Sequence, residues 1–239
     1  CGSSEPEYKQ NPRCLPLNTI LAGKYLVGKV LGEGGFGITY MGYDLNMKAR
    51  IAIKEYFPVE LVSRDTTRLT SPDGKAVSGG GNDCVISLSG EKSKTYQQGL
   101  KKYVDEARNV SRFAGIPGIV SVKDFFYEND TAYIVMEYIE GISLKEYLKQ
   151  KGGKVSEEEA LAILRPVLEA LEKVHAAGIV HRDISPDNIM LTFAEKEKAE
   201  QASASDTTST PSAAAVYGNI SAVNLIDFGA ARMTSNFET

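Results

Sequence analysis

The sequence predicts an α+β fold of two lobes, in which an antiparallel sheet with one helix precedes a mainly helical part. Short β-branched and aromatic runs broken by turn residues fill 24–56 and indicate three strands. Apolar residues at helical spacing follow in 98–114 and predict a helix. Farther along, Ser143 and Ser156 each stand three residues before a glutamate, which is typical of a helix start.

Composition limits the classes of function. The chain of 239 residues has 42% hydrophobic residues, which is enough for one large domain or two small lobes. Its net charge of -4 gives no support for a nucleic-acid or anionic-membrane surface. No apolar run approaches the ~20 residues that span a bilayer. Three irregularly spaced cysteines favour a reducing, cytoplasmic location over a disulfide framework.

The first residue is Cys1, so we interpret the chain as a fragment or a processed product. The run "CGSS" fits an arbitrary boundary, the last residues of a zinc ribbon, or the start of a lipoprotein. A membrane tether outside these residues stays open. Residues 1–23 are polar and rich in proline, which is typical of a linker or lead-in.

The first lobe is expected over 24–138. Its strands are the runs "KYLVGKVL", "ITYMGYD" and "RIAIKEY", followed after the helix by "GIVSVKDFFYEND" and "TAYIVMEYIEG". Turn formers dominate 57–97, which we interpret as an insertion with one strand at 84–88.

The second, partial lobe is expected over 139–239. The two capped runs predict helices at 143–150 and from 156 to about 177, where a glycine follows. Residues 194–219 are rich in Ala, Ser, Thr, Glu and Lys and are interpreted as a low-complexity insertion. The run "AVNLIDFG" then returns to strand.

Two charged residues stand beside apolar patterns. Glu106 shares a helix face with Tyr103 and Val110, and a carboxylate beside an apolar stripe needs a partner. Lys54 ends the apolar run "IAIK" and either extends to solvent or pairs with Glu106.

Three short motifs carry chemistry. Gly32, Gly34 and Gly37 form G-x-G-x-x-G, and a strand follows them, which fits either a flap over phosphates or an ordinary hairpin. In "HRDISPDN" and "DFG", Asp183 is a candidate proton acceptor; Asn188 and Asp227 are candidate Mg²⁺ ligands.

Together, these motifs in this order resemble the eukaryotic-like protein kinase family, and most closely its bacterial serine/threonine branch. The resemblance covers about 23–56, 98–193 and 220–232. It implies a two-lobed protein-kinase-like fold that transfers the γ-phosphoryl group of Mg·ATP to protein serine or threonine. It also implies that Lys54, held by Glu106, contacts the α- and β-phosphates.

The resemblance further implies an adenine site and self-association for autophosphorylation. Met136 takes the gatekeeper position, and the Glu137 carbonyl and Ile139 amide bind the adenine edge. The implied ATP-binding residues are Leu31, Gly32, Gly34, Gly37, Thr39, Ala52, Lys54, Met136, Glu137, Ile139 and Met190. Thr39 departs from the usual valine. Thr234, Ser235 and Thr239 are the candidate sites of activating phosphorylation.

Two departures leave alternatives open. Ser185 stands where such kinases carry a lysine that touches the transferred phosphate. Losing that contact should cost about 1.5–3 kcal/mol, or about 10- to 100-fold in rate. The chain also stops at Thr239, ten residues after Gly229, so the second lobe is expected to be truncated. An ATP-binding pseudokinase or scaffold is the alternative, followed by a small-molecule kinase.

Overall fold

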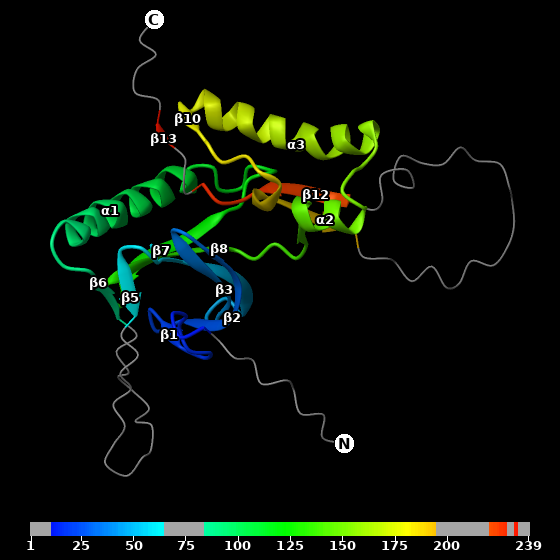
Figure 1. The fold of residues 1–239 in the computed structure, drawn as a ribbon. Coiled ribbons are helices and arrows are strands. Elements are labelled where there is room, and N and C mark those ends of the chain that lie inside the picture. The colour runs from blue at the N-terminus through cyan, green and yellow to red at the C-terminus, as the bar shows by residue number, and fades with distance from the viewer. Residues whose placement is uncertain (1–10, 65–83, 195–219, 229–231, 234–239) are drawn as a thin grey trace, which may run out of the picture. The chain divides into compact units, whose positions relative to one another are not determined.

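The computed structural model describes residues 11–64, 84–194, 220–228 and 232–233, and it divides into two compact units. Unit 1 comprises Cys1–Ser111 and Val122–Tyr138, and unit 2 comprises Arg112–Ser121 and Ile139–Thr239. Figure 1 labels the elements of both, and each unit is described by itself.

Unit 1 is built on a six-stranded antiparallel sheet with the strand order β1-β2-β3-β4-β8-β7. Its strands are β1 (Ile20–Leu21), β2 (Tyr25–Gly34), β3 (Gly37–Asp44), β4 (Ala49–Tyr56), β7 (Val122–Glu128) and β8 (Thr131–Glu137). The antiparallel sheet predicted for the first lobe is confirmed. The central strand β4 lies between β3 and β8 and is therefore supported on both edges.

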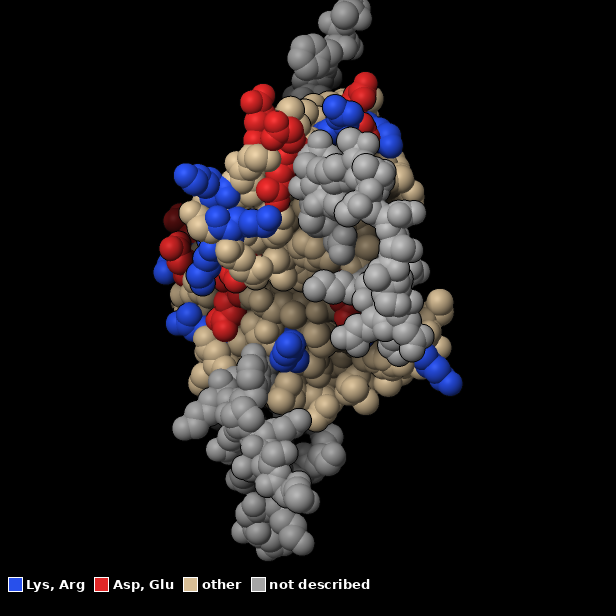
Figure 2. Space-filling view, turned by 90° about the vertical axis from the view of Figure 1, so that its right-hand side faces the viewer, with Lys and Arg blue, Asp and Glu red and all other residues tan. Residues whose placement is uncertain are grey.

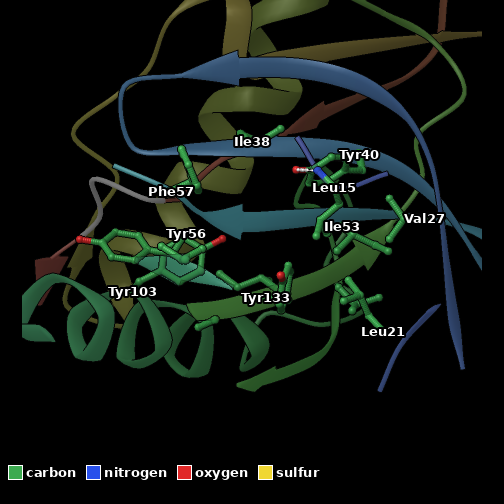
Figure 3. Packing of buried hydrophobic residues seen from close by; sticks show 14 of the residues in the cluster. Leu15, Leu21, Val27, Ile38, Tyr40, Ile53, Tyr56, Phe57, Tyr103 and Tyr133 are labelled. Atoms are coloured by element: carbon green, nitrogen blue, oxygen red, sulfur yellow. Dashed lines mark hydrogen bonds between the residues drawn. The ribbon is translucent and has the colours of Figure 1, made fainter. Parts of the chain in front are cut away.

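The core of unit 1 also takes in the lead-in segment. Leu15 and Leu21 are fully buried, although the sequence pattern of 1–23 is that of a polar linker. Figure 3 shows both side chains among those of the sheet, including Tyr40 and Val27. The described part of the lead-in is thus a packed edge of the unit.

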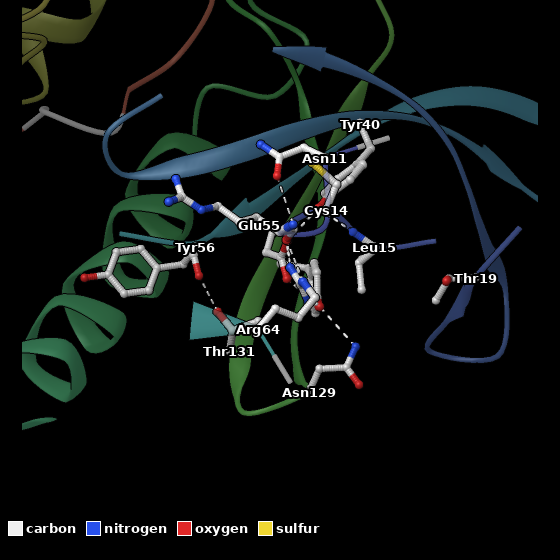
Figure 4. Close-up of polar contacts among 12 residues, drawn as sticks. Asn11, Cys14, Leu15, Thr19, Tyr40, Glu55, Tyr56, Arg64, Asn129 and Thr131 are labelled. Atoms are coloured by element: carbon white, nitrogen blue, oxygen red, sulfur yellow. Dashed lines mark hydrogen bonds and ion pairs between the residues drawn. The ribbon is translucent and has the colours of Figure 1, made fainter. Parts of the chain in front are cut away.

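The predicted insertion contains a small hairpin, β5 (Val62–Arg64) paired with β6 (Val85–Ser87). The strand expected at 84–88 is present, whereas β5 was missed. Arg64 extends from β5 into the interior, where its Nη2 lies 2.6 Å from Oε2 of the fully buried Glu55 (Figure 4). The hairpin is therefore fastened to β4 by a buried ion pair.

One helix, α1 (Glu91–Ser111), completes unit 1 and lies alongside β7 and β8 (Figure 1). The prediction of 98–114 was seven residues late at the start and three too long at the end. The helix buries one face, which consists of Tyr96, Leu100, Tyr103, Val104, Ala107 and Val110. The first turns were missed because Tyr96 is their only large apolar residue.

Unit 2 contains two α-helices among its described residues, α2 (Leu144–Gln150) and α3 (Glu157–Ala176). Both predicted caps are present, since Ser143 and Ser156 accept hydrogen bonds from the backbone N–H of the residue three positions on. The remaining elements are β9 (Ile142–Ser143), β10 (Ile179–Val180), the 3₁₀ helix η1 (Pro186–Asn188), β11 (Ile189–Phe193), β12 (Ile220–Leu225) and β13 (Arg232–Met233). Strands β12, β11 and β9 form one sheet, and β10 pairs with β13.

Surface charge is mixed. On the face shown in Figure 2, acidic and basic side chains are interspersed with uncharged surface. Among the described helices, none combines the length and the apolar character that a membrane crossing requires.

Candidate active site

The predicted ATP-binding residues of unit 1 lie on four neighbouring strands, β2, β3, β4 and β8. Thr39 pairs with Lys54, and Ala52 pairs with Met136 across the other edge of β4. Residues directly opposite in a sheet point to the same face, and so do residues two apart in a strand. Thr39, Ala52, Lys54 and Met136 therefore share one face, on which each is partly exposed.

The glycine motif forms the closed end of the β2–β3 hairpin, where Gly34 pairs with Gly37. A Cβ on Gly32 would have no atom within 4 Å, and one on Gly34 would meet only the Gly37 carbonyl oxygen at 3.9 Å. The surface at these two glycines is therefore open to a phosphate. Gly37 has a packing role as well, because a Cβ there would lie 2.3 Å from the Glu55 carbonyl oxygen. Leu31 is 42% exposed at the bulge in β2.

Helix α1 is hydrogen-bonded to the backbone of the predicted phosphate-binding lysine. The Tyr103 hydroxyl donates to the carbonyl oxygen of Lys54 at 2.9 Å. Glu106 follows one turn later and is partly exposed. Burial raises the pKa of Tyr56, and the negative charge of Glu106 adds to this. Glu106 is thus close enough to act electrostatically on β4 two residues beyond Lys54.

In unit 2, the loop after β10 holds its histidine inside the protein. His181 is 1% exposed, and its ring lies 4.4 Å from that of Phe228. Burial lowers the pKa of His181, and its Nδ1 accepts from the backbone N–H of Asp183 at 3.3 Å. A buried neutral imidazole fits the structural role expected for it. Arg182 lies in the left-handed region with φ 67°, which turns the loop sharply at this point.

The catalytic and metal candidates of unit 2 are linked by the side-chain amide of Asn188 and by a backbone hydrogen bond between Asn188 and Ile226. Asn188 Nδ2 donates to Oδ2 of Asp183 at 2.9 Å and to its carbonyl oxygen at 3.0 Å. The Asn188 carbonyl oxygen accepts from the N–H of Ile226 at 2.8 Å, directly before Asp227. Asn188 thus contacts Asp183 directly, and its backbone bonds the residue before Asp227, although a long chain segment separates Asn188 from Asp227.

The donor set fits Mg²⁺. Both amide hydrogens of Asn188 are directed at Asp183, so its Oδ1 is the atom left to bind a cation. Asp227 adds a carboxylate two residues after the end of β12, where its φ of 57° is in the left-handed region. Mg²⁺ commonly binds one or two such protein oxygens and takes its other ligands from phosphates and water.

A lysine not anticipated from the sequence contacts the same loop. Lys145 of α2 places Nζ 3.0 Å from Oδ1 of Asp187, two residues after Ser185. Both side chains are more than half exposed, so the pair is worth little to stability. It does place a cation beside the loop in which Ser185 replaces lysine.

The other predicted site residues lie as follows. Glu137 ends β8 in unit 1, Ile139 begins the last part of unit 2, and Met190 lies on β11 opposite Ser143. Thr234, Ser235, Thr239 and Cys1 fall outside the described residues.

Comparison with known proteins assigns the chain to a family. The model of the protein kinase domain matches residues 84–239, which is more than half of the chain. The chain belongs to the protein kinase family. The chain is 29% identical over 171 residues to the serine/threonine-protein kinase PrkC of Bacillus subtilis, and the match covers 72% of the chain but 21% of PrkC.

Further relatives agree with this assignment. A probable serine/threonine-protein kinase of Streptomyces coelicolor is 30% identical over 176 residues, which are 72% of this chain and 21% of the relative. The solved structure of PpkA-294 in its apo form matches with a TM-score of 0.66 at 30% identity, over 91% of this chain and 62% of that one. The chain thus spans about a fifth of the length of these two curated relatives.

Proposed function

We propose that the protein is a serine/threonine protein kinase that transfers the γ-phosphoryl group of Mg·ATP to a protein hydroxyl. The observation that carries the proposal is the Asp183–Asn188–Asp227 arrangement. The bond of Asn188 to Asp183 and the backbone bond of Asn188 to Ile226 support a candidate base near two oxygen ligands of the kind that Mg²⁺ prefers. Family membership and the order of the motifs support the same activity.

Each unit would supply a different part of the chemistry. In unit 1, the open glycines Gly32 and Gly34 would admit phosphates, and Lys54 with Glu106 would bind them. Leu31, Thr39, Ala52 and Met136, on the strands of this unit, would contact the adenine.

In unit 2, Asp183 would accept the proton of the attacking hydroxyl, and the amide of Asn188 fixes its carboxylate for that task. Mg²⁺, held by Asn188 and Asp227, would neutralise developing phosphate charge when bound.

The proposal is tested by phosphoryl transfer from radiolabelled Mg·ATP to a generic protein such as casein. The Asp183→Asn variant keeps the size of the side chain but removes the proton acceptor. We expect it to lose about 10²- to 10⁴-fold in rate. Equal rates for the two proteins would overturn the assignment of Asp183. Phosphorylation of serine and threonine, and not tyrosine, is expected on acid hydrolysis of the product.

An ATP-binding pseudokinase is the second candidate, and Ser185 is the observation that favours it. If the protein is a pseudokinase, it should bind Mg·ATP, but its rate of phosphoryl transfer should be no higher than that of the Asp183→Asn variant. A small-molecule kinase would instead phosphorylate hydroxyl compounds and leave casein unlabelled. Cytoplasmic location and self-association for autophosphorylation follow from the proposed activity, and fractionation and a concentration-dependent rate of autophosphorylation test them.

A further inference from the structure

Three tyrosines join α1 to the strand that carries Lys54. The ring of Tyr56, on β4, lies 5.2 Å from that of Tyr103 and 5.5 Å from that of Tyr96. Figure 3 shows Tyr56 and Tyr103 side by side over the helix. Both helix tyrosines also donate hydrogen bonds to backbone carbonyls, Tyr103 to Lys54 at 2.9 Å and Tyr96 to Asp130 at 2.8 Å.

The spacing of these residues links the contact to Glu106. Tyr96, Gly99, Tyr103 and Glu106 follow one another at steps of three and four, which places them along one side of α1. Tyr103 precedes Glu106 by about 4.5 Å along the helix axis, at 1.5 Å per residue. The hydrogen bond from Tyr103 to Lys54 therefore fixes the height of Glu106, meaning its position along the helix axis, relative to the backbone of Lys54.

Gly99 makes this close approach achievable. A Cβ at Gly99 would lie 2.0 Å from the hydroxyl oxygen and 3.0 Å from Cζ of Tyr56. A glycine within a helix is unfavourable by about 1 kcal/mol compared with alanine. The contact with Tyr56 gives a physical reason for it, because any side chain would force either the packed Tyr56 ring or α1 to shift. Gly99 thus packs closely against Tyr56, one helical turn before Tyr103.

We propose that Tyr103 is a positioning residue that sets the register of α1 against β4, so that Glu106 is held at the height of Lys54. The contact of Gly99 with Tyr56 fixes the distance between helix and strand, and the hydroxyl of Tyr103 fixes their relative height. The inference rests on the proposed role of Lys54 and Glu106 in phosphate binding. It adds a residue that touches neither nucleotide nor metal.

The test compares two matched substitutions on the same helix, Tyr103→Phe and Tyr96→Phe. Each removes one hydroxyl that donates to a backbone carbonyl, and both rings are buried, at 6% and 1% exposure. We expect both to lower the urea midpoint by similar amounts. Only Tyr103→Phe should lower kcat, by about 10-fold, since small misplacements of catalytic groups are costly. Tyr96→Phe should stay within about twofold of the unaltered protein. Equal kcat for the two variants would overturn the inference.

A double-mutant cycle separates this inference from the proposed function. Glu106→Gln is combined with Tyr103→Phe, and the loss from Tyr103→Phe should largely vanish when Glu106 no longer acts. Additive losses in the cycle would refute the positioning role. If Lys54→Met leaves phosphoryl transfer unchanged, the proposed role of Lys54 fails. If Lys54→Met abolishes transfer while the two tyrosine variants behave alike, the positioning role alone fails.

Discussion

Replacing Arg64 with methionine should destabilise unit 1 more than any substitution of a surface charge. Arg64 Nη2 lies 2.6 Å from Glu55 Oε2, and the side chains are 2% and 0% exposed. The same carboxylate accepts hydrogen bonds from Tyr40 at 2.8 Å and Tyr133 at 3.0 Å (Figure 4). Burial, and then the charge of Glu55, raise the pKa of both tyrosines, so these hydroxyls remain donors.

The magnitude follows from what methionine removes. It keeps an unbranched apolar chain but leaves the charge of Glu55 buried with only hydroxyl donors. Breaking a buried ion pair from one side typically costs about 3–5 kcal/mol. The bond from Arg64 Nε to the Arg13 carbonyl oxygen, at 2.6 Å, is lost as well. The expected loss is a large share of the ~5–15 kcal/mol that stabilises a typical domain.

Urea unfolding followed by circular dichroism measures this loss, since the chain contains no tryptophan to report by fluorescence. Arg108→Met is the matched control, because its pair with Asp105 is 3.1 Å long and about half exposed. That control should cost less than about 1 kcal/mol.

The double variant Glu55→Gln/Arg64→Met should regain part of the stability, because it leaves no buried charge. It also keeps the experiment informative if Arg64→Met fails to fold. A loss from Arg64→Met no larger than that from Arg108→Met would refute the reasoning.

Three further outcomes are expected. Gly99→Ala should lose about 1–3 kcal/mol of unfolding free energy in urea, although alanine has the better helix propensity, because the new Cβ clashes with the Tyr56 hydroxyl. Adding Tyr56→Phe to this variant should reverse most of the loss, and a neutral or stabilising effect of Gly99→Ala alone would contradict the packing. Burial raises the pKa of Cys14 to about 11, so its thiol stays protonated below pH ~9 and its contribution to stability is lost only as the pH rises toward 11. Mass spectrometry at pH 8 should therefore find iodoacetamide on the partly exposed Cys84 well before it is found on Cys14. Equal rates of alkylation of the two cysteines would show that the Cys14 thiol is not buried. Ser185→Lys should raise kcat by about 10- to 100-fold; an unchanged kcat would mean that another group, such as a cation beside the loop, already serves the phosphate.

Apolar patterns predicted the helices and most strands of unit 1, because apolar spacing reports directly on a buried face, whereas β12 alone was predicted among the described strands of unit 2. The N-terminal caps of α2 and α3 were also predicted from the sequence, since a capping box depends only on residues three positions apart. The start of α1 was not, because polar residues fill its first turns and only Tyr96 marks the buried face. Local rules fail where a helix is held by a few long-range contacts.

The buried pair of Glu55 and Arg64 shows a different limit. Alternation in β4 could have indicated Glu55, because it continues the buried positions Ile51 and Ile53 at steps of two. Arg64 could not be found in this way, because an arginine among turn formers is typical of the surface. The pairing of Arg64 with Glu55 depends on how the chain folds back between them, and no short-range sequence pattern predicts this.

The insertion and α1 together form one continuous segment that is fastened to β4 at two successive residues. Near its start, Arg64 binds the side chain of Glu55; near its end, Tyr103 binds the carbonyl oxygen of Lys54. Side chains of neighbouring strand residues point to opposite faces, so the first bond secures the sheet from the face opposite Lys54. The two bonds should therefore be separable by experiment. Loss of Arg64 should appear mainly in unfolding free energy, because it leaves a buried charge. Loss of the Tyr103 hydroxyl should appear mainly in kcat, because it leaves the fold intact and frees the height of Glu106.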